Sequence, residues 1–336
     1  MHTPNSQSTI DDTLVQRLQA YFDIHDGEHD ACGKRERQQI VVQPHFQLIF
    51  SAQKEPVGAE VLVRFRDGST DQQIPLQAAL QLISKSPSRM HQLSSEIIAA
   101  AAAALPTLMN ETRNKIFCVW INTPGSGVSY ELIAKLLAAA RKHDIPPSQI
   151  GLEILEGDRA VDKAVFNESV PHGIPFALDD LGSNEVDGGI DEARKSGILS
   201  LHGHEVGFQK VKVDRTLRAN RALYLTAICR LLHLFRGVTV EGIEDQQQLS
   251  ELLRLAQVST NIDRAEILRL EDDELLLQLE SHLNAPLVAP AQSIPDHLSI
   301  QGYIHDNKPR PLEDVVTRLR QLQEAQFRLA GDGSTA

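Results

Sequence analysis

The chain has 336 residues, of which 41% are hydrophobic and only 4% aromatic, which allows one large α/β domain or two smaller ones with an aliphatic core. The net charge of −12 argues against a nucleic-acid polymer as partner, since neutralising phosphates needs clustered Lys and Arg. A single nucleotide remains compatible with this charge, because a bound cation can offset an acidic site.

Two further features indicate the compartment. The longest apolar stretch, Ile97–Leu105, is too short for a membrane span, and the N-terminus has no visible signal peptide. The three cysteines, Cys32, Cys118 and Cys229, are widely spaced and odd in number. This pattern predicts a reduced, cytoplasmic protein without disulfides or a membrane span.

The first predicted element is a short amphipathic helix over residues 10–22, followed by polar sequence to residue 38. We expect residues 1–38 to be an N-terminal helical appendage and residues 39–330 to form the main domain. This appendage is one candidate surface for a protein partner.

Strand-like and helix-like segments alternate from residue 39 onward, which predicts a TIM-like (β/α)8 barrel, with an open doubly wound sheet as the alternative. The first two strands are too close for a helical crossover, so we expect a hairpin and one antiparallel strand. The predicted strands are Phe46–Phe50, Glu60–Phe65, Phe117–Asn122, Gly151–Leu155, Pro175–Asp180, Phe208–Asp214, Val238–Gly242 and Ser299–Tyr303. The predicted helices cover 76–84, 90–105, 129–142, 160–169, 215–235 and 245–256.

Two stretches fit a regular barrel poorly and are interpreted as insertions, at about 184–207 and 258–297. The second contains a predicted acidic helix, Arg264–Leu283, which is another candidate surface for a protein partner. The last predicted helix, Leu312–Leu329, carries apolar residues at helical spacing. This pattern fits either core packing or a dimer seam.

The segment Phe176–Gly182 is an apolar run that ends in two adjacent carboxylates, Asp179 and Asp180, and a glycine. Paired oxygen ligands at the end of a strand suit a divalent cation such as Mg²⁺ or Mn²⁺. The same residue sequence is also typical of a turn or a helix cap. The motif alone therefore leaves both interpretations open.

Polar residues in or just after the other predicted strands strengthen the metal interpretation. Each alone fits a buried, hydrogen-bonded structural residue, but a converging set of acids would repel without cations between them. The set predicts two metal ions held by oxygen ligands, an arrangement suited to phosphodiester hydrolysis, with Lys212 orienting the water. The set comprises Glu60, Asn122, Glu153, Asp179, Asp180, Lys212, Glu241 and Gln301.

Seven segments in this order resemble the EAL family of cyclic di-GMP phosphodiesterases. Val61 and Leu181 replace the residues that are usual in the family's signature strand and Asp-Asp-Phe-Gly motif. The segments are Gly58–Phe65, Ile121-Asn122, Leu152–Glu156, Asp179–Gly182, Val211–Asp214, Glu241–Glu244 and Gln301–Tyr303.

The resemblance implies hydrolysis of cyclic di-GMP to linear pGpG by a dimer that uses two Mg²⁺ or Mn²⁺ ions. It implies that Lys212, Glu241 and Asp180 are catalytic, that Arg64 and Gln301 meet the substrate, and that Glu156 anchors the loop after Asp180. The implied metal ligands are Glu60, Asn122, Glu153, Asp179, Asp180 and Glu241.

The chain departs from the family pattern after Gly182, where Ser183–Asp187 replaces the usual Thr-Gly-Tyr-Ser-Ser. In the family that loop couples dimerisation to metal binding. A catalytically weak or inactive receptor for cyclic di-GMP therefore remains as an alternative to an active enzyme. A protein-interaction module is another alternative, which the predicted helices at 10–22 and 264–283 favour.

Overall fold

The structure is a computed structural model that describes residues 40–68, 70–84, 86–155, 163–181, 208–284, 295, 297–301 and 307–332. The predicted N-terminal helix over 10–22 and the predicted insertion at 184–207 lie outside the described residues. The Pro-rich connector after residue 284 is described only at Pro295 and from residue 297 onward.

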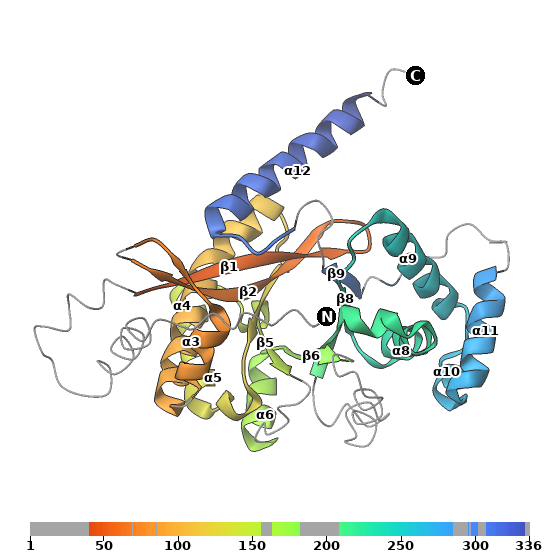
Figure 1. Cartoon of the computed structure of the whole chain (residues 1–336), viewed down its shortest axis with the longest axis horizontal. Coiled ribbons are helices and arrows are strands. Elements are labelled where there is room, and N and C mark those ends of the chain that lie inside the picture. Colours follow the sequence, from red (N-terminus) through yellow and green to blue (C-terminus); the bar gives the residue numbers. More distant parts are fainter. Residues whose placement is uncertain are drawn as a thin grey trace, which may run out of the picture.

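Eight strands form a closed barrel, which confirms the predicted TIM-like (β/α)8 architecture and excludes the open sheet (Figure 1). The chain closes the barrel where the first strand pairs with the second. A ninth strand, β3 (Gln73–Ile74), pairs with β2 outside the ring of eight. The barrel strands are β1 (Ile40–Ser51), β2 (Pro56–Asp67), β4 (Cys118–Asn122), β5 (Ile150–Leu155), β6 (Phe176–Leu181), β7 (Phe208–Val213), β8 (Gly237–Glu241) and β9 (Leu298–Gln301).

Strand β1 is antiparallel to both of its neighbours, as the short connection to β2 predicts. All barrel pairs from β2 through β9 are parallel. Their carboxyl ends therefore meet at one rim, and the hairpin register Gln47↔Glu60 brings β1 to the same rim.

Helices flank the barrel on both sides, with α3 to α6 grouped apart from α8 to α11 (Figure 1). Capping side chains define several helix starts, because Ser129, Asn220 and Asp245 each accept a backbone N–H of the first turn. The helices are α3 (Leu76–Ile83), α4 (Pro87–Thr112), α5 (Tyr130–Lys142), α6 (Lys163–Ser169), α8 (Arg221–Leu234), α9 (Gln246–Thr260), α10 (Arg264–Arg269), α11 (Asp272–Asn284) and α12 (Leu312–Asp332). Short 3-10 helices occur at Gly125–Gly127, Pro147–Gln149, Val170–His172 and Arg215–Ala219.

The predicted continuous helix Arg264–Leu283 is wrong, because the structure forms two helices, α10 and α11, there. Arg230 of α8 explains the break. Its guanidinium donates to the carbonyl oxygens of Ile267 and Leu270 at the end of α10 and pairs with Asp272 at the start of α11. Carbonyls that accept from Arg230 satisfy a helix end, so the chain turns here.

Within the described residues, one helical segment, Ser88–Thr112 of α4, is long and apolar enough to cross a membrane by length and composition. Half of its most apolar window is buried in the fold, and α4 packs against α5, α12 and strands of the barrel. Burial of this kind is ordinary for the core helix of a packed domain.

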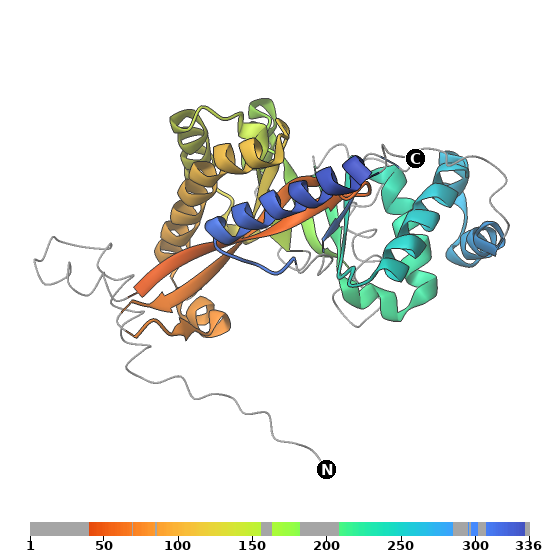
Figure 2. The ribbon, with the colours of Figure 1, turned by 90° about the horizontal axis from the view of Figure 1, so that it is seen from above.

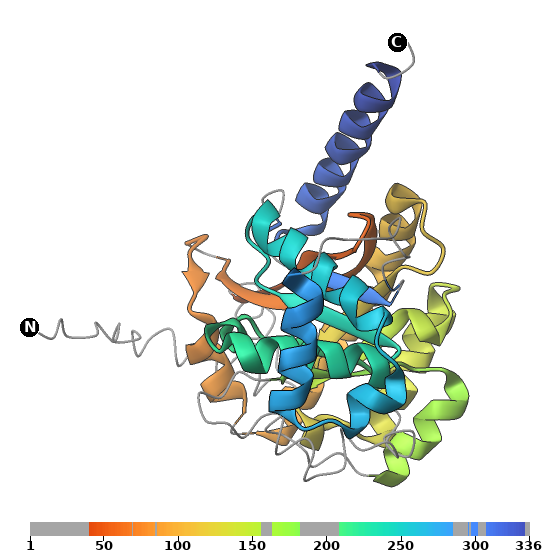
Figure 3. The same ribbon diagram turned by 90° about the vertical axis from the view of Figure 1, so that its right-hand side faces the viewer.

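The last helix, α12, contacts α4 and β1, and it crosses over the β1–β2 hairpin in the view from above (Figure 2). Val315 and Leu319 of its first half are buried in the core, so core packing accounts for this part. The rest of α12 extends away from the barrel (Figure 3).

The barrel interior below the rim is filled around one large side chain, Trp120 of β4. The indole packs with Ile49 and Ala177 and is 8% exposed. A Cβ added at Gly151 would lie 2.3 Å from Cε3 of this ring, so glycine at that position makes the room for it. We call the group Ile49, Trp120, Gly151 and Ala177 the barrel floor.

We expect Gly151→Val to lower the free energy of unfolding by about 1–3 kcal/mol, because the added atoms must displace the Trp120 ring. Gly127→Ala is the matched control, since a Cβ there would lie at an ordinary 3.7 Å from its nearest neighbour. Urea unfolding of both variants beside wild type measures the difference. Equal stability of Gly151→Val and wild type would contradict this account of the barrel floor.

Candidate active site

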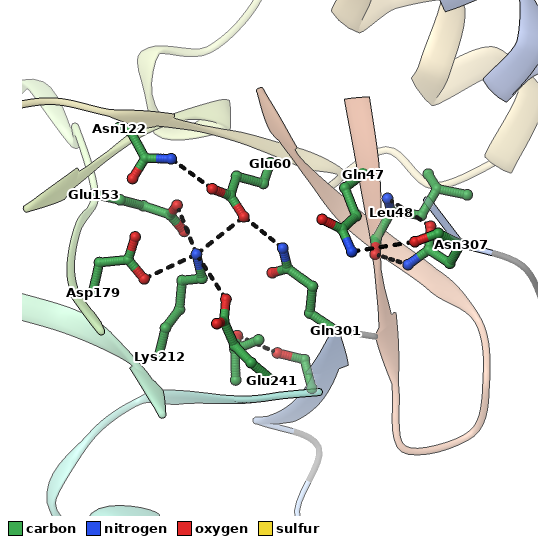
Figure 4. Close-up of polar contacts among 12 residues, drawn as sticks. Gln47, Leu48, Glu60, Asn122, Glu153, Asp179, Lys212, Glu241, Gln301 and Asn307 are labelled. Carbon is green, nitrogen blue, oxygen red and sulfur yellow. Dashed lines mark hydrogen bonds and ion pairs between the residues drawn. The ribbon is translucent and has the colours of Figure 1, made fainter. Parts of the chain in front are cut away.

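Seven polar side chains, one from each of the strands β2 and β4 to β9, point into the upper barrel and meet at the rim (Figure 4). The side-chain alternation of β-strands explains why they share one face. We call them the acidic ring: Glu60, Asn122, Glu153, Asp179, Lys212, Glu241 and Gln301.

The ammonium of Lys212 lies at the centre of the acidic ring (Figure 4). Its Nζ atom is 2.9 Å from Asp179 Oδ1, 3.1 Å from both Glu60 Oε2 and Glu241 Oε1, and 3.2 Å from Glu153 Oε2. Four carboxylates therefore surround one cation whose side chain is only 2% exposed. Such a buried cluster depends on mutual compensation, since an unpaired buried charge is very costly.

Burial disfavours the charged form of Lys212, but the four carboxylates outweigh burial and hold its pKa well above the usual value. Lys212 is therefore charged at every physiological pH. It acts in this structure as the counter-ion of the acidic ring.

Two amides hold Glu60 in place. Asn122 Nδ2 donates to Glu60 Oε1, and Gln301 Nε2 donates to Glu60 Oε2. Burial raises the pKa of Glu60, but the Lys212 charge and these hydrogen bonds together lower it below the usual value. Glu60 is thus a fixed carboxylate.

The other glutamates of the acidic ring are harder to ionise. Burial raises the pKa of Glu153 well above its usual range, against the attraction of Lys212. Burial also raises the pKa of Glu241 to about 7, helped by the nearby charges of Asp179 and Glu60. Glu241 is the most open of the four carboxylates, with its side chain 20% exposed, so it lies where solvent meets the site.

The acidic ring fits a divalent cation. Glu60, Glu153 and Asp179 each offer an oxygen, and these atoms lie within 4.8 Å of one another. Glu153 Oε1 and Gln301 Oε1 are buried and accept no hydrogen bond from the described part of the chain. Carboxylate and amide oxygens are the ligands that Mg²⁺ and Mn²⁺ prefer, and the two unbonded oxygens are the acceptors that a cation would satisfy.

Three other predicted site residues lie apart from the acidic ring or cannot be placed. Arg64 is half-buried on the hairpin face that carries Glu60, and its Nη1 donates to the Val63 carbonyl oxygen at 2.8 Å. Asp180 belongs to β6, but its side chain lies outside the described residues, as does all of Glu156. The implied roles of Asp180 and Glu156 stay predictions.

Two interior residues escaped the sequence interpretation. Gln47 pairs across the hairpin with Glu60, and its Nε2 donates to the Asn307 carbonyl oxygen at 3.2 Å. Lys210 lies two residues before Lys212 on β7 and is 7% exposed. Strand alternation was the available signal, because residues two apart on a strand share a face.

Comparison with known proteins agrees with this architecture. The family model "EAL domain" matches residues 34–258. No curated protein matches the chain.

Among solved structures, the EAL enzyme Bd1971, in a form with cAMP and cyclic di-GMP bound, has a TM-score of 0.58 at 19% identity, covering 91% of this chain and 70% of that one. The PaMucR phosphodiesterase, in complex with c-di-GMP, has a TM-score of 0.56 at 17% identity, covering 88% and 99%. An EAL domain protein from Listeria monocytogenes EGD-e has a TM-score of 0.54 at 17% identity, covering 92% and 98%. At these identities the likeness concerns the fold.

The raised pKa of Glu241 predicts a pH dependence of stability in metal-free protein. A carboxyl whose folded-state pKa is about 7 rather than 4.5 stabilises the fold while protonated, and this contribution is lost as pH rises through 7. We therefore expect the free energy of unfolding of Glu241→Gln to rise relative to wild type between pH 4.5 and about 7. Urea unfolding in EDTA measures this difference. Glu55→Gln in the exposed hairpin turn is the control. If the free energies of unfolding of Glu241→Gln and wild type differ by the same amount at every pH, the prediction is wrong.

Proposed function

The chain belongs to the EAL domain family, and from this membership we propose that it is a metal-dependent phosphodiesterase that hydrolyses cyclic di-GMP to linear pGpG. The observation that carries the proposal is the acidic ring, in which seven strands each bring one polar side chain to the same rim. PaMucR and Bd1971, which share the fold, have both been solved with this dinucleotide.

We assign the metal ligands to Glu60, Asn122, Glu153, Asp179 and Glu241, with Asp180 as a further ligand. Two Mg²⁺ or Mn²⁺ ions are expected. When bound, such ions lower the pKa of a water molecule and stabilise the negative charge that develops on a phosphodiester. The donor set and the two unbonded buried oxygens support this assignment.

The chain's own residues have separate tasks in this proposal. Lys212 holds its positive charge beside four carboxylates, which suits it to orient the attacking water and to offset negative charge in the transition state. Arg64 lies on the hairpin face toward the open end of the barrel, where a guanidinium can bind a substrate phosphate. Gln301 fixes Glu60 through its amide nitrogen and keeps its oxygen unbonded.

The reaction is an addition of water across one phosphodiester bond. The water oxygen bonds to phosphorus, one ribose oxygen leaves and takes a proton, and a phosphate monoester remains on the other nucleotide. Glu241 has the most exposed carboxylate of the acidic ring, so it lies where water and the departing proton can pass between the site and solvent.

A receptor that binds cyclic di-GMP without turnover is the second candidate. The replaced segment Ser183–Asp187 favours it, because that segment follows the two aspartates of the site. Dimerisation, a protein partner at residues 10–22 or 264–283, and a cytoplasmic location are parts of the proposal that rest on the sequence.

The function is tested by incubating the full chain with cyclic di-GMP and Mg²⁺ or Mn²⁺ and separating the products. We expect pGpG from wild type and at least a hundredfold lower kcat for Glu60→Ala, since misplacing a reacting group by about 1 Å already costs this much. Glu55→Ala, a carboxylate change in the exposed hairpin turn, should retain wild-type turnover. Binding without product in wild type would identify a receptor instead of an enzyme.

Lys212→Met separates catalysis from metal binding. Removing the ammonium takes away the group that orients water, so we expect kcat to fall by a factor of about 10²–10⁴. Calorimetric titration with Mg²⁺ should still show binding, because every oxygen ligand remains. A variant that retains wild-type turnover would exclude Lys212 from the chemistry.

A further inference from the structure

A second buried lysine lies beneath the acidic ring. Lys210 shares the interior face of β7 with Lys212, and only 7% of it is exposed. Its Nζ atom lies 4.3 Å from the centroid of the Trp120 ring. No carboxylate of the described chain lies within ion-pair distance of this ammonium, so an aromatic face is its direct partner.

The barrel floor fixes the position of Lys210. The Trp120 ring lies directly against β5, where it occupies the space that a side chain at Gly151 would need. Ile49 and Ala177 pack against the same indole. The indole is therefore closely packed, and the Lys210 ammonium lies on its face beneath the acidic ring.

A desolvated cation–π contact contributes about 2 kcal/mol. This energy alone offsets only a small part of the cost of burying an ammonium. Burial lowers the pKa of Lys210, and the negative charge of Glu153 is the largest influence that opposes burial. Lys212 repels it. The acidic ring and Lys210 are thus coupled through space without a hydrogen bond.

We propose that the ammonium of Lys210, held on Trp120 beneath the acidic ring, lowers the affinity of that ring for divalent cations. The proposal rests on the metal binding described under the proposed function. A divalent cation bound in the acidic ring lies near this ammonium, and two positive charges repel each other.

Lys210→Met removes a buried ammonium that its surroundings disfavour, so the melting temperature of the metal-free protein should stay equal or rise. The same change should tighten Mg²⁺ binding about three- to tenfold, as expected for one charge acting across a partly screened interior. If Lys210 had only a packing role, Lys210→Met would lower the melting temperature and would leave Mg²⁺ binding unchanged or weaker.

The experiment is a calorimetric titration of the full chain with Mg²⁺ after removal of metal by EDTA, together with thermal melts with and without Mg²⁺. Lys210→Arg keeps the charge and the aromatic contact, so its affinity should match wild type. Lys115→Met, on the exposed surface, makes the same change in net charge far from the site and should also match. Lys210→Gln repeats the neutral change with a polar end, in case Lys210→Met does not fold.

Unchanged or weaker Mg²⁺ affinity in the neutral variants would overturn the proposal, as would an Arg variant that behaves like the Met variant. If wild type binds Mg²⁺ and hydrolyses cyclic di-GMP while the neutral variants bind equally well, this inference alone fails. If wild type binds no divalent cation, the metal-dependent function fails and the inference fails with it.

Discussion

The ammonium of Lys212 within four carboxylates is the interaction on which the rest of the site depends. Closing the barrel brings acids that are far apart in sequence to within a few ångströms of one nitrogen. Without that charge, the same closure would bury uncompensated anions, a change that ordinarily costs several kcal/mol. A lysine from β7 that reaches the middle of the acidic ring thus supplies the charge that balances this polar interior.

The antiparallel strand β1 matters for the same reason. A hairpin lets the chain close the barrel without a helical crossover between β1 and β2, and it places Gln47 directly opposite Glu60. The neighbouring amides of Asn122 and Gln301 then restrain both oxygens of Glu60. Side chains from β4, β7 and β9 thus set the orientation of Glu60.

Much of this arrangement could be predicted from the sequence. The eight strands were predictable because apolar runs of strand length recur along the chain, and the rim residues because the ends of parallel strands meet. The break between α10 and α11 was not, since its cause, Arg230, lies on another helix. Local sequence carries no signal for a partner that only tertiary packing supplies.

Lys210 and Trp120 show a second limit. In sequence, Trp120 is one more apolar residue of a buried strand, and Lys210 is one of the charged residues within the predicted strand Phe208–Asp214. The interaction of the two residues requires β4 and β7 to face each other across the barrel interior, and these strands are not neighbours in the sheet. The pair became visible only when the closed interior placed an indole face next to an ammonium.

Trp120 is also the only tryptophan of the chain. Selectively excited indole emission of this protein therefore arises from a single point, directly under the acidic ring and in contact with a cation. Events at the rim that change the charge or packing around that point have an optical signal without any added label. The barrel floor thus makes the protein its own spectroscopic reporter.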